Sequence, residues 1–375
     1  MHLGGRPNPA DRLSQLTQLI ERQPILLEYI KELNLSHAHE WLTTNVEIIE
    51  LLPRLSLKSL EIGGMDWARL PPKLQSALYD RIVDPGLVAL SLECIDNMDI
   101  TALTNRHHLK ELIIDEVCIN NNPPCSIRTP WLPSNEYPVG VQGPAARLGR
   151  LEVLACGESL KYHLQSAENG EATLKIHRPE DLAISAYGWD DDMAKAVAVL
   201  LRTSASSVKE YSIREELNIT SNPHRALTPP ILFSFSRFTG LQRLEIWSSF
   251  HHFRMARNAT FETVIKEFET MSRSSHPIVL SSIDLDFQSQ DYNPWGTDGL
   301  PDIGTRIRTV ALSGVWNQID EILSRDVFRF LKEMVITFNR GVPALFQADL
   351  DASRALLLSH MPRLQERGVQ FNITW

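Results

Sequence analysis

The chain has 375 residues, of which 43% are hydrophobic and 22% charged, values that are typical of folded proteins and exclude a disordered chain. Its 46 acidic residues exceed its 37 Lys and Arg residues, for a formal net charge of -9. Because phosphate backbones and anionic lipids attract basic surfaces, this sign argues against nucleic acid or a membrane as the main partner. The first thirty residues carry charges and prolines where a signal peptide needs an apolar stretch, so we expect an intracellular protein, cytoplasmic or nuclear.

One short pattern recurs along the chain: three apolar residues, the second three positions after the first and the third two positions after the second. The central apolar residues of its copies are Leu33, Leu60, Leu90, Leu112, Leu154, Tyr211, Leu244, Ile283, Val310, Met334 and, in a weaker final copy, Phe371. The alternation of apolar and polar residues at the end of each copy is typical of a strand with one buried face. Two weaker strand candidates, 174–176 and 182–184, lie between the fifth and sixth copies.

Segments with apolar residues at helical spacing alternate with these strands. They cover residues 72–83, 191–203, 260–272, 318–331 and 353–367. Strands that alternate with helices favour parallel pairing with helical crossovers. An earlier helix over residues 11–23 is expected to cap the first open edge of the sheet.

The copies are spaced by about 34 residues on average, which is longer than the 20–29 residues usual for leucine-rich repeats. We therefore predict an α/β fold of the leucine-rich-repeat solenoid type with irregular long repeats, a curved parallel sheet and helices on the convex side. A compact doubly wound α/β domain, which also alternates strand and helix, is the alternative. The recurrence of a Lys-Glu pair at the start of several strands favours the repeat, and its lysines are Lys31, Lys110, Lys209 and Lys332.

The expected domain organisation is a capping segment over residues 1–29 followed by the solenoid over residues 30–375. Residues 120–147 are too rich in proline for a helix or a central strand and are predicted to be an inserted loop. Residues 288–306, which combine prolines and glycines, are predicted to be another loop. The sequence leaves the role of both loops open.

Motifs for catalysis, metal binding or cofactor binding are not found. The sequence has no glycine-rich phosphate loop and no GxSxG nucleophile elbow. His39 and Glu40 begin like a zinc-protease motif, but Thr43 stands where the second histidine is required. We therefore expect no enzymatic activity, no metal and no cofactor; a hydrolase-type enzyme on an α/β core, with Ser, His and Asp brought together by the fold, is the alternative.

The sheet face opposite the helices is predicted to be acidic. If each central apolar residue points into the core, the residues one before, one after and three after it point to the concave face. Its acidic positions are Glu32, Glu61, Glu93, Glu111, Asp115, Glu210, Glu245, Asp284, Asp286 and Glu333, and its only bases are Arg214 and Arg243.

A protein target with a basic surface is the partner that such a face favours. The alternative is a solvated strand face partly neutralised by the lysines that open the strands. Trp247 lies on the same face and is a candidate anchor for a partner. Packing under the loop that begins at Phe250 is the alternative role for Trp247.

Several segments resemble the leucine-rich-repeat region of F-box proteins from mushroom-forming fungi. The similar segments are 26–33 (LLEYIKEL), 51–55 (LLPRL), 60–62 (LEI), 67–78 (WARLPPKLQSAL), 87–92 (LVALSL), 95–98 (IDNM) and 109–112 (LKEL). The resemblance covers roughly residues 11–120, and the later repeats match only in periodicity.

The resemblance implies the substrate-recognition part of a Skp-cullin-F-box ubiquitin ligase, in which an F-box binds the Skp adaptor and the repeats hold the target. The F-box itself is not found, because no segment ahead of the first repeat has its leucine-proline-x-glutamate opening. We therefore expect the Skp adaptor as a partner only if an F-box lies upstream of Met1. A stand-alone leucine-rich-repeat scaffold unrelated to ubiquitin is the alternative.

Overall fold

The computed structural model describes residues 9–36, 42, 47–98, 109–115, 117, 148–154, 179–185, 191–214, 230–250, 259–289, 314–339 and 347–374. The chain forms two compact units. The first unit comprises Met1–Glu180 and Asp190–Leu200, and the second comprises Asp181–Trp189 and Leu201–Trp375. In both units the strands pair in parallel and in chain order, so the predicted α/β class with parallel strands is confirmed.

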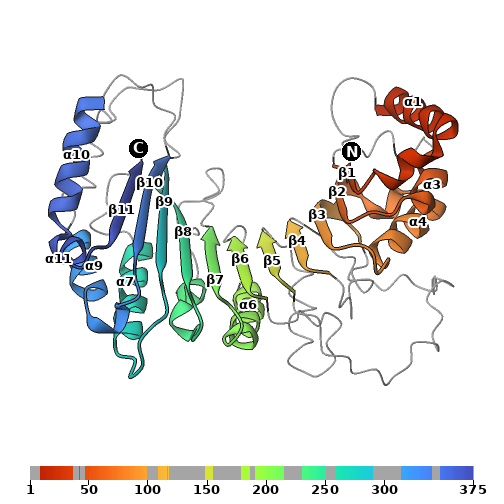
Figure 1. The fold of residues 1–375 in the computed structure, drawn as a ribbon. Helices are drawn as coiled ribbons and strands as arrows, with labels where there is room; N and C mark the ends of the chain where they lie inside the picture. The colour runs from red at the N-terminus through yellow and green to blue at the C-terminus, as the bar shows by residue number, and fades with distance from the viewer. Residues whose placement is uncertain are drawn as a thin grey trace, which may run out of the picture. The chain divides into compact units, whose positions relative to one another are not determined.

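The first unit carries strands β1 (Glu32–Leu35), β2 (Ser59–Asp66), β3 (Ala89–Asp96), β4 (Glu111–Asp115) and β5 (Arg150–Leu154). Its helical segments are α1 (Pro9–Arg22), η1 (Pro24–Glu28), α3 (Glu47–Leu51), η2 (Leu52–Arg54), η3 (Trp67–Arg69) and α4 (Pro72–Ile82). Figure 1 shows α3 and α4 together on one side of β2 and β3. The helix expected over residues 11–23 is present as α1.

The second unit carries strands β6 (Asp181–Ser185), β7 (Glu210–Arg214), β8 (Arg243–Phe250), β9 (Ser282–Ser289), β10 (Glu333–Asn339) and β11 (Gln370–Thr374). Between these strands lie η5 (Pro230–Phe233), η6 (Phe235–Arg237), α7 (Ala259–Ser272), α9 (Val315–Leu323), η8 (Asp326–Phe328), α10 (Gln347–Ser359) and α11 (Pro362–Glu366). Helix α6 (Asp191–Ser204) is divided between the units, with its residues up to Leu200 in the first. Figure 1 shows α10 and α11 beside β11, at the end of the sheet.

The central apolar residues of the repeated pattern stack in register from strand to strand. They are Leu33, Leu60, Leu90, Leu112 and Leu151 in the first unit, and Leu182, Tyr211, Leu244, Ile283, Met334 and Phe371 in the second. All of them except the half-buried Phe371 are buried. The third apolar residue of each copy, two positions later, is buried as well. One face of each sheet is thereby removed from water, which is the main source of its stability.

The start of a strand is hydrogen-bonded to the residue just before the preceding strand, and this arrangement recurs. The carbonyl oxygen of Lys31 accepts hydrogen bonds from the backbone N–H groups of Lys58 (2.7 Å) and Ser59 (3.0 Å). The carbonyl of Lys209 does the same for Gln242 and Arg243. The lysine just before each of these strands therefore fixes where the next strand begins. It is the first residue of a Lys-Glu pair in both cases.

The fifth copy of the pattern has a different register from the predicted one. The prediction centred it on Leu154, but the structure pairs Leu112 of β4 with Leu151. Leu148, Leu151 and Val153 are the buried residues of this copy. Leu148, Leu151 and Leu154 are spaced by three, so the sequence fits either register, and pairing with β4 decides between them.

Two strand predictions have other outcomes. The weaker candidate 182–184 is part of β6, while 174–176 lies outside the described residues. The copy centred on Val310 also lies outside them. Strand β9 pairs directly with β10, with Ser282 opposite Glu333.

Two of the predicted helices are interrupted. The helix expected over 318–331 is present as α9 followed by the short η8, and the helix expected over 353–367 is divided into α10 and α11. Pro362 has no N–H to continue α10, and α11 begins there. The buried Asp320 of α9 accepts hydrogen bonds from the backbone N–H groups of Arg363 (3.2 Å) and Leu364 (2.9 Å) and so stabilises the new start.

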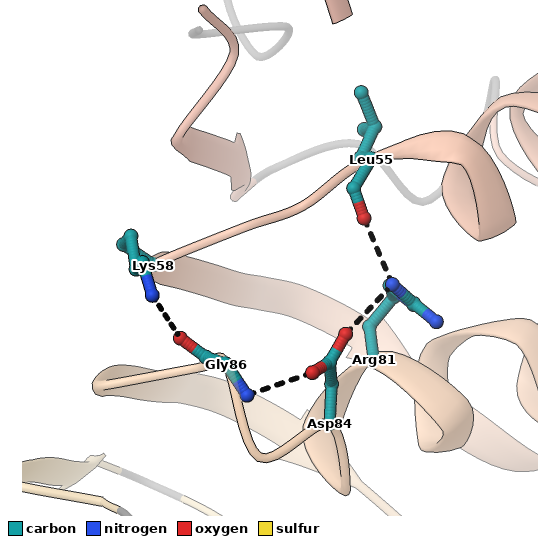
Figure 2. Close-up of polar contacts among 5 residues, drawn as sticks. All are labelled: Leu55, Lys58, Arg81, Asp84 and Gly86. Carbon is teal, nitrogen blue, oxygen red and sulfur yellow. Dashed lines mark hydrogen bonds and ion pairs between the residues drawn. The ribbon is translucent and has the colours of Figure 1, made fainter. Parts of the chain in front are cut away.

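A polar cluster connects α4 to the strands on both sides of it (Figure 2). Arg81 donates from Nη1 to the carbonyl oxygen of Leu55 (2.8 Å) and to Asp84 Oδ2 (2.9 Å). Asp84 Oδ1 accepts from the N–H of Gly86 (2.7 Å), and Lys58 Nζ donates to the Gly86 carbonyl (3.2 Å). These bonds fix the turn that leads from α4 into β3.

Candidate protein-binding surface

Polar side chains recur at equivalent positions of the strands in both units. Because side chains alternate across a strand, residues beside the buried central position point to the opposite face. We call this surface the polar sheet face, and it includes every residue predicted for the concave site. On the first unit these are Glu32, Glu61, Glu93, Glu111 and Asp115; on the second they are Glu210, Arg214, Arg243, Glu245, Trp247, Asp284, Asp286 and Glu333.

The corrected register adds residues that the prediction missed. With Leu151 as the central residue of β5, Arg150 and Glu152 lie on the polar sheet face, and β6 adds Asp181. Leu148, Leu151 and Val153 also fit the apolar pattern. Aligning Leu148 with the first apolar residue of the other copies would have centred β5 on Leu151. The face keeps its excess of acids with these additions.

Arg150 neutralises part of the acidic face on the first unit. Its guanidinium lies 2.8 Å from Glu152 Oε2 and 3.8 Å from Glu111 Oε1. Glu152 is only 4% exposed, and a buried carboxylate needs such a partner. The β4–β5 end of this unit is therefore internally paired and less available to an external cation.

Strands β2 and β3 share a local distortion that keeps an acid on the polar sheet face. Gly63 pairs with Glu93 and Met65 pairs with Ile95, while Gly64 and Cys94 between them both have positive φ, at 66° and 49°. The extra residue in each strand leaves Met65 and Ile95 buried. A β-carbon on Gly63 would lie 2.9 Å from the backbone oxygen of Glu93, so the close approach requires glycine.

The second unit brings six of its polar-face residues into two adjacent rows across β7, β8 and β9. Ser212, Glu245 and Asp284 are register partners in one row, and Arg214, Trp247 and Asp286 are register partners in the next. We call these six residues the Trp247 cluster. Neighbouring strands are about 4.8 Å apart and alternate residues about 6.7 Å apart along a strand, so the cluster is compact.

The aromatic ring of the cluster is held by one cation and one anion. The guanidinium carbon of Arg214 lies 4.8 Å from the centroid of the Trp247 ring. The indole Nε1–H of Trp247 donates a hydrogen bond to Glu245 Oε1. On the edge of the cluster, Arg243 Nη2 lies 3.7 Å from Asp284 Oδ2, which makes a long and partly exposed ion pair.

The negative charges of the two aspartates of β9, Asp284 and Asp286, are only partly balanced by cations among the described residues. Partial burial raises the pKa of Asp286 to about 6, and the neighbouring charges of Asp284 and Glu245 add to the effect. Burial also raises the pKa of Asp284, assisted by Glu245 and opposed by Arg243. Among the described residues, Asp286 Oδ1 has no hydrogen-bond partner although it is buried.

Ser212 adds a second unsatisfied group to the same place. Its side chain is 6% exposed, and its buried Oγ has no hydrogen-bond partner within the described part of the chain. Ser212 stands directly beside Glu245 in the register of β7 and β8. Buried polar atoms are normally paired, so the Trp247 cluster carries hydrogen-bonding capacity that its own residues do not use.

Other candidate chemistry has no support in the residues that the structure describes. Within them, no group of three His, Cys, Asp or Glu side chains is arranged to hold a metal ion. No described helix is long and apolar enough to cross a membrane. The histidine pairs, the zinc-protease-like His39 and Glu40, and the loop predicted over 120–147 lie outside the described ranges, and so do the residues after Phe250 that were the alternative packing partner for Trp247. Of the loop predicted over 288–306, residues 288 and 289 are the end of strand β9 and the rest lies outside the described ranges.

Comparison with known proteins finds no family model that matches the chain and no curated protein that matches it.

Proposed function

We propose that this chain is a protein-interaction module of the leucine-rich-repeat solenoid type, whose polar sheet face binds a basic segment of a protein partner. The observation that carries the proposal is the register of the second unit, which places Glu245 beside Asp284 and Asp286 beside Trp247 on one face. Acidic groups that gather on one face attract a cationic partner and guide its approach.

The repeat architecture supports the solenoid part of the proposal. Strands in chain order, the recurring apolar pattern and the repeated carbonyl contacts at strand entry are what a stack of similar units requires, since each unit packs on its neighbours. In a solenoid the sheet face away from the helices is the concave surface, and such surfaces serve as extended binding sites.

The resemblance to F-box proteins suggests the biological role of the module. On that basis we propose that it is the substrate-recognition part of a Skp-cullin-F-box ubiquitin ligase, with the target bound by the polar sheet face. Because no F-box is found in residues 1–375, binding of purified Skp adaptor is measured on the product of the full transcript, including any codons upstream of Met1. Retention of the adaptor would support it, and failure to bind would favour the stand-alone scaffold.

The binding proposal is tested with a labelled peptide that alternates arginine and serine, measured by fluorescence anisotropy at low salt. The variant with Glu61, Glu210 and Glu333 all replaced by Gln removes three charges from the polar sheet face and is expected to bind the peptide about tenfold more weakly. Affinity should also fall steeply as salt is added, because exposed charges are screened.

A matched variant controls for net charge. Glu21, Asp351 and Glu366 are exposed on helices α1, α10 and α11, and replacing them with Gln, Asn and Gln removes the same three charges away from the polar sheet face. This variant should bind the peptide nearly as well as the unmodified chain. Equal weakening by the two variants would refute the proposal, since the net charge and not the face would then govern binding.

A further inference from the structure

We propose that the Trp247 cluster is a subsite for one arginine side chain of the partner, held between the Trp247 ring and the carboxylates of Asp286 and Asp284. This inference rests on the proposed function, because it assigns part of the polar sheet face a ligand of defined chemistry.

Within the described residues, the carboxylates of the cluster outnumber its bases. Glu245, Asp284 and Asp286 stand together on β8 and β9, Arg214 is the one base of the cluster, and Arg243 beside it lies 3.7 Å from Asp284. Burial, and after it the negative charges of Asp284 and Glu245, raise the pKa of Asp286. A bound cation would stabilise the ionised form of Asp286 and relieve its repulsion from Asp284.

The unused hydrogen-bonding atoms lie in the same two rows. Ser212 Oγ and Asp286 Oδ1 are buried and, within the described residues, unpartnered, and they stand on opposite sides of the Glu245 and Trp247 positions. A guanidinium brings five N–H donors in a planar fork, so one group can bond both Asp286 and Asp284. Small shifts of these side chains on binding would open the covered atoms to the ligand.

The ring of Trp247 distinguishes guanidinium from ammonium. It already stacks with one guanidinium, that of Arg214, at 4.8 Å, and the proposed ligand would stack on the ring from the side of β9. Asp286 on β9 is the register partner of Trp247, so a cation bound to its carboxylate also lies beside the ring. A guanidinium is planar, weakly hydrated and able to stack while it bonds a carboxylate through two N–H groups, whereas an ammonium group is strongly hydrated and compact.

The test compares two peptides that differ only in having arginine or lysine alternating with serine, each measured against the full chain. The arginine peptide should bind about tenfold more tightly, the gain expected from one stacked and bidentate contact. The variants Asp286→Asn and Trp247→Phe should each reduce this preference to about twofold or less. Trp247→Phe keeps an aromatic ring in the face, and thermal unfolding checks that each variant is folded.

Glu210→Gln serves as the control on the same face. Glu210 is exposed on β7 and outside the Trp247 cluster, so its replacement should weaken both peptides alike and keep the preference for arginine. Equal binding of the two peptides, or a preference that survives both cluster variants, would overturn the inference. If the three-site Gln variant on the polar sheet face also leaves the affinity for both peptides unchanged, the proposed function itself fails.

Discussion

The guanidinium of Arg214 stacks on the indole of Trp247 at 4.8 Å, and the two residues are register partners on β7 and β8. The indole N–H donates a hydrogen bond to Glu245, two residues earlier on β8. A cation and an anion of the chain thus orient one aromatic ring on an otherwise polar face, as an anchor for a partner requires.

Replacing Arg214 with Gln should strengthen the binding of a basic peptide. The substitution removes a positive charge next to the Trp247 ring, so the repulsion of an incoming cation falls, and affinity at low salt should rise about twofold to fivefold. Fluorescence anisotropy with the arginine peptide measures the change. A loss of affinity in a variant that unfolds at an unchanged temperature would contradict this, because it would make Arg214 a contact for the partner.

The stability of the second unit should depend on the ionisation of Asp286. Its pKa is raised to about 6 in the folded protein from an ordinary value of 3.8, so between these pH values the folded protein holds a proton that the unfolded chain releases. The contribution of this group to the free energy of unfolding therefore falls as the pH rises through that window. Asp284, whose pKa is also raised, acts in the same direction.

Asp286→Asn isolates this effect. The variant should be more stable than the unmodified chain at pH 7.5, by about 1 kcal/mol after allowance for partial exposure, and equally stable near pH 4. Urea unfolding at the two pH values measures the difference. A variant that loses stability at pH 7.5 and not at pH 4 would show that the charged carboxylate is stabilising, contrary to its raised pKa.

Arg81 should contribute far more to stability than Arg69, although both form an ion pair with an aspartate three positions away along the chain. The side chain of Arg81 is 17% exposed and also bonds the Leu55 carbonyl, whereas that of Arg69 is 74% exposed. Arg81→Met should cost about 1–3 kcal/mol, because it leaves partly buried acceptors without a donor. Arg69→Met should cost less than about 0.5 kcal/mol.

Hydrogen exchange of the first unit is the appropriate measurement for this pair, since two units need not unfold together. Faster exchange at the turn between α4 and β3 in Arg81→Met, with little change in Arg69→Met, is expected. Similar exchange in the two variants would mean that the cluster in Figure 2 adds nothing beyond an exposed ion pair.

Gly63→Ala should destabilise the first unit. The added carbon would lie 2.9 Å from the backbone oxygen of Glu93 and 3.2 Å from its Cβ, so β2 and β3 would have to separate locally at a cost of about 1–3 kcal/mol. Gly240→Ala is the control, because its nearest neighbour, the Val208 oxygen, is at 3.7 Å, an ordinary contact distance. A harmless Gly63→Ala would show that the paired distortion at Gly64 and Cys94 tolerates a wider strand spacing.

The sequence alone predicts most of the strands and their buried faces. The spacing of Leu57, Leu60 and Ile62 repeats along the chain, and these three residues are buried where the pattern places them, whereas in β5 the pattern fits two registers. Because the burial of apolar side chains governs which strand face points inward, this pattern also predicts that Glu245, Trp247 and Asp284 share the opposite face.

Tertiary structure decided everything that depends on contacts between distant parts of the chain. Leu151 and Leu154 fit the local pattern equally well, and only the neighbouring strand β4 selects Leu151 and brings Arg150 to Glu152. The stacking of Arg214 on Trp247, and the contribution of Glu245 to the raised pKa of Asp286, likewise arise between residues on different strands. Local spacing predicts which face a side chain occupies, whereas its partners and its pKa follow from the register of the strands beside it.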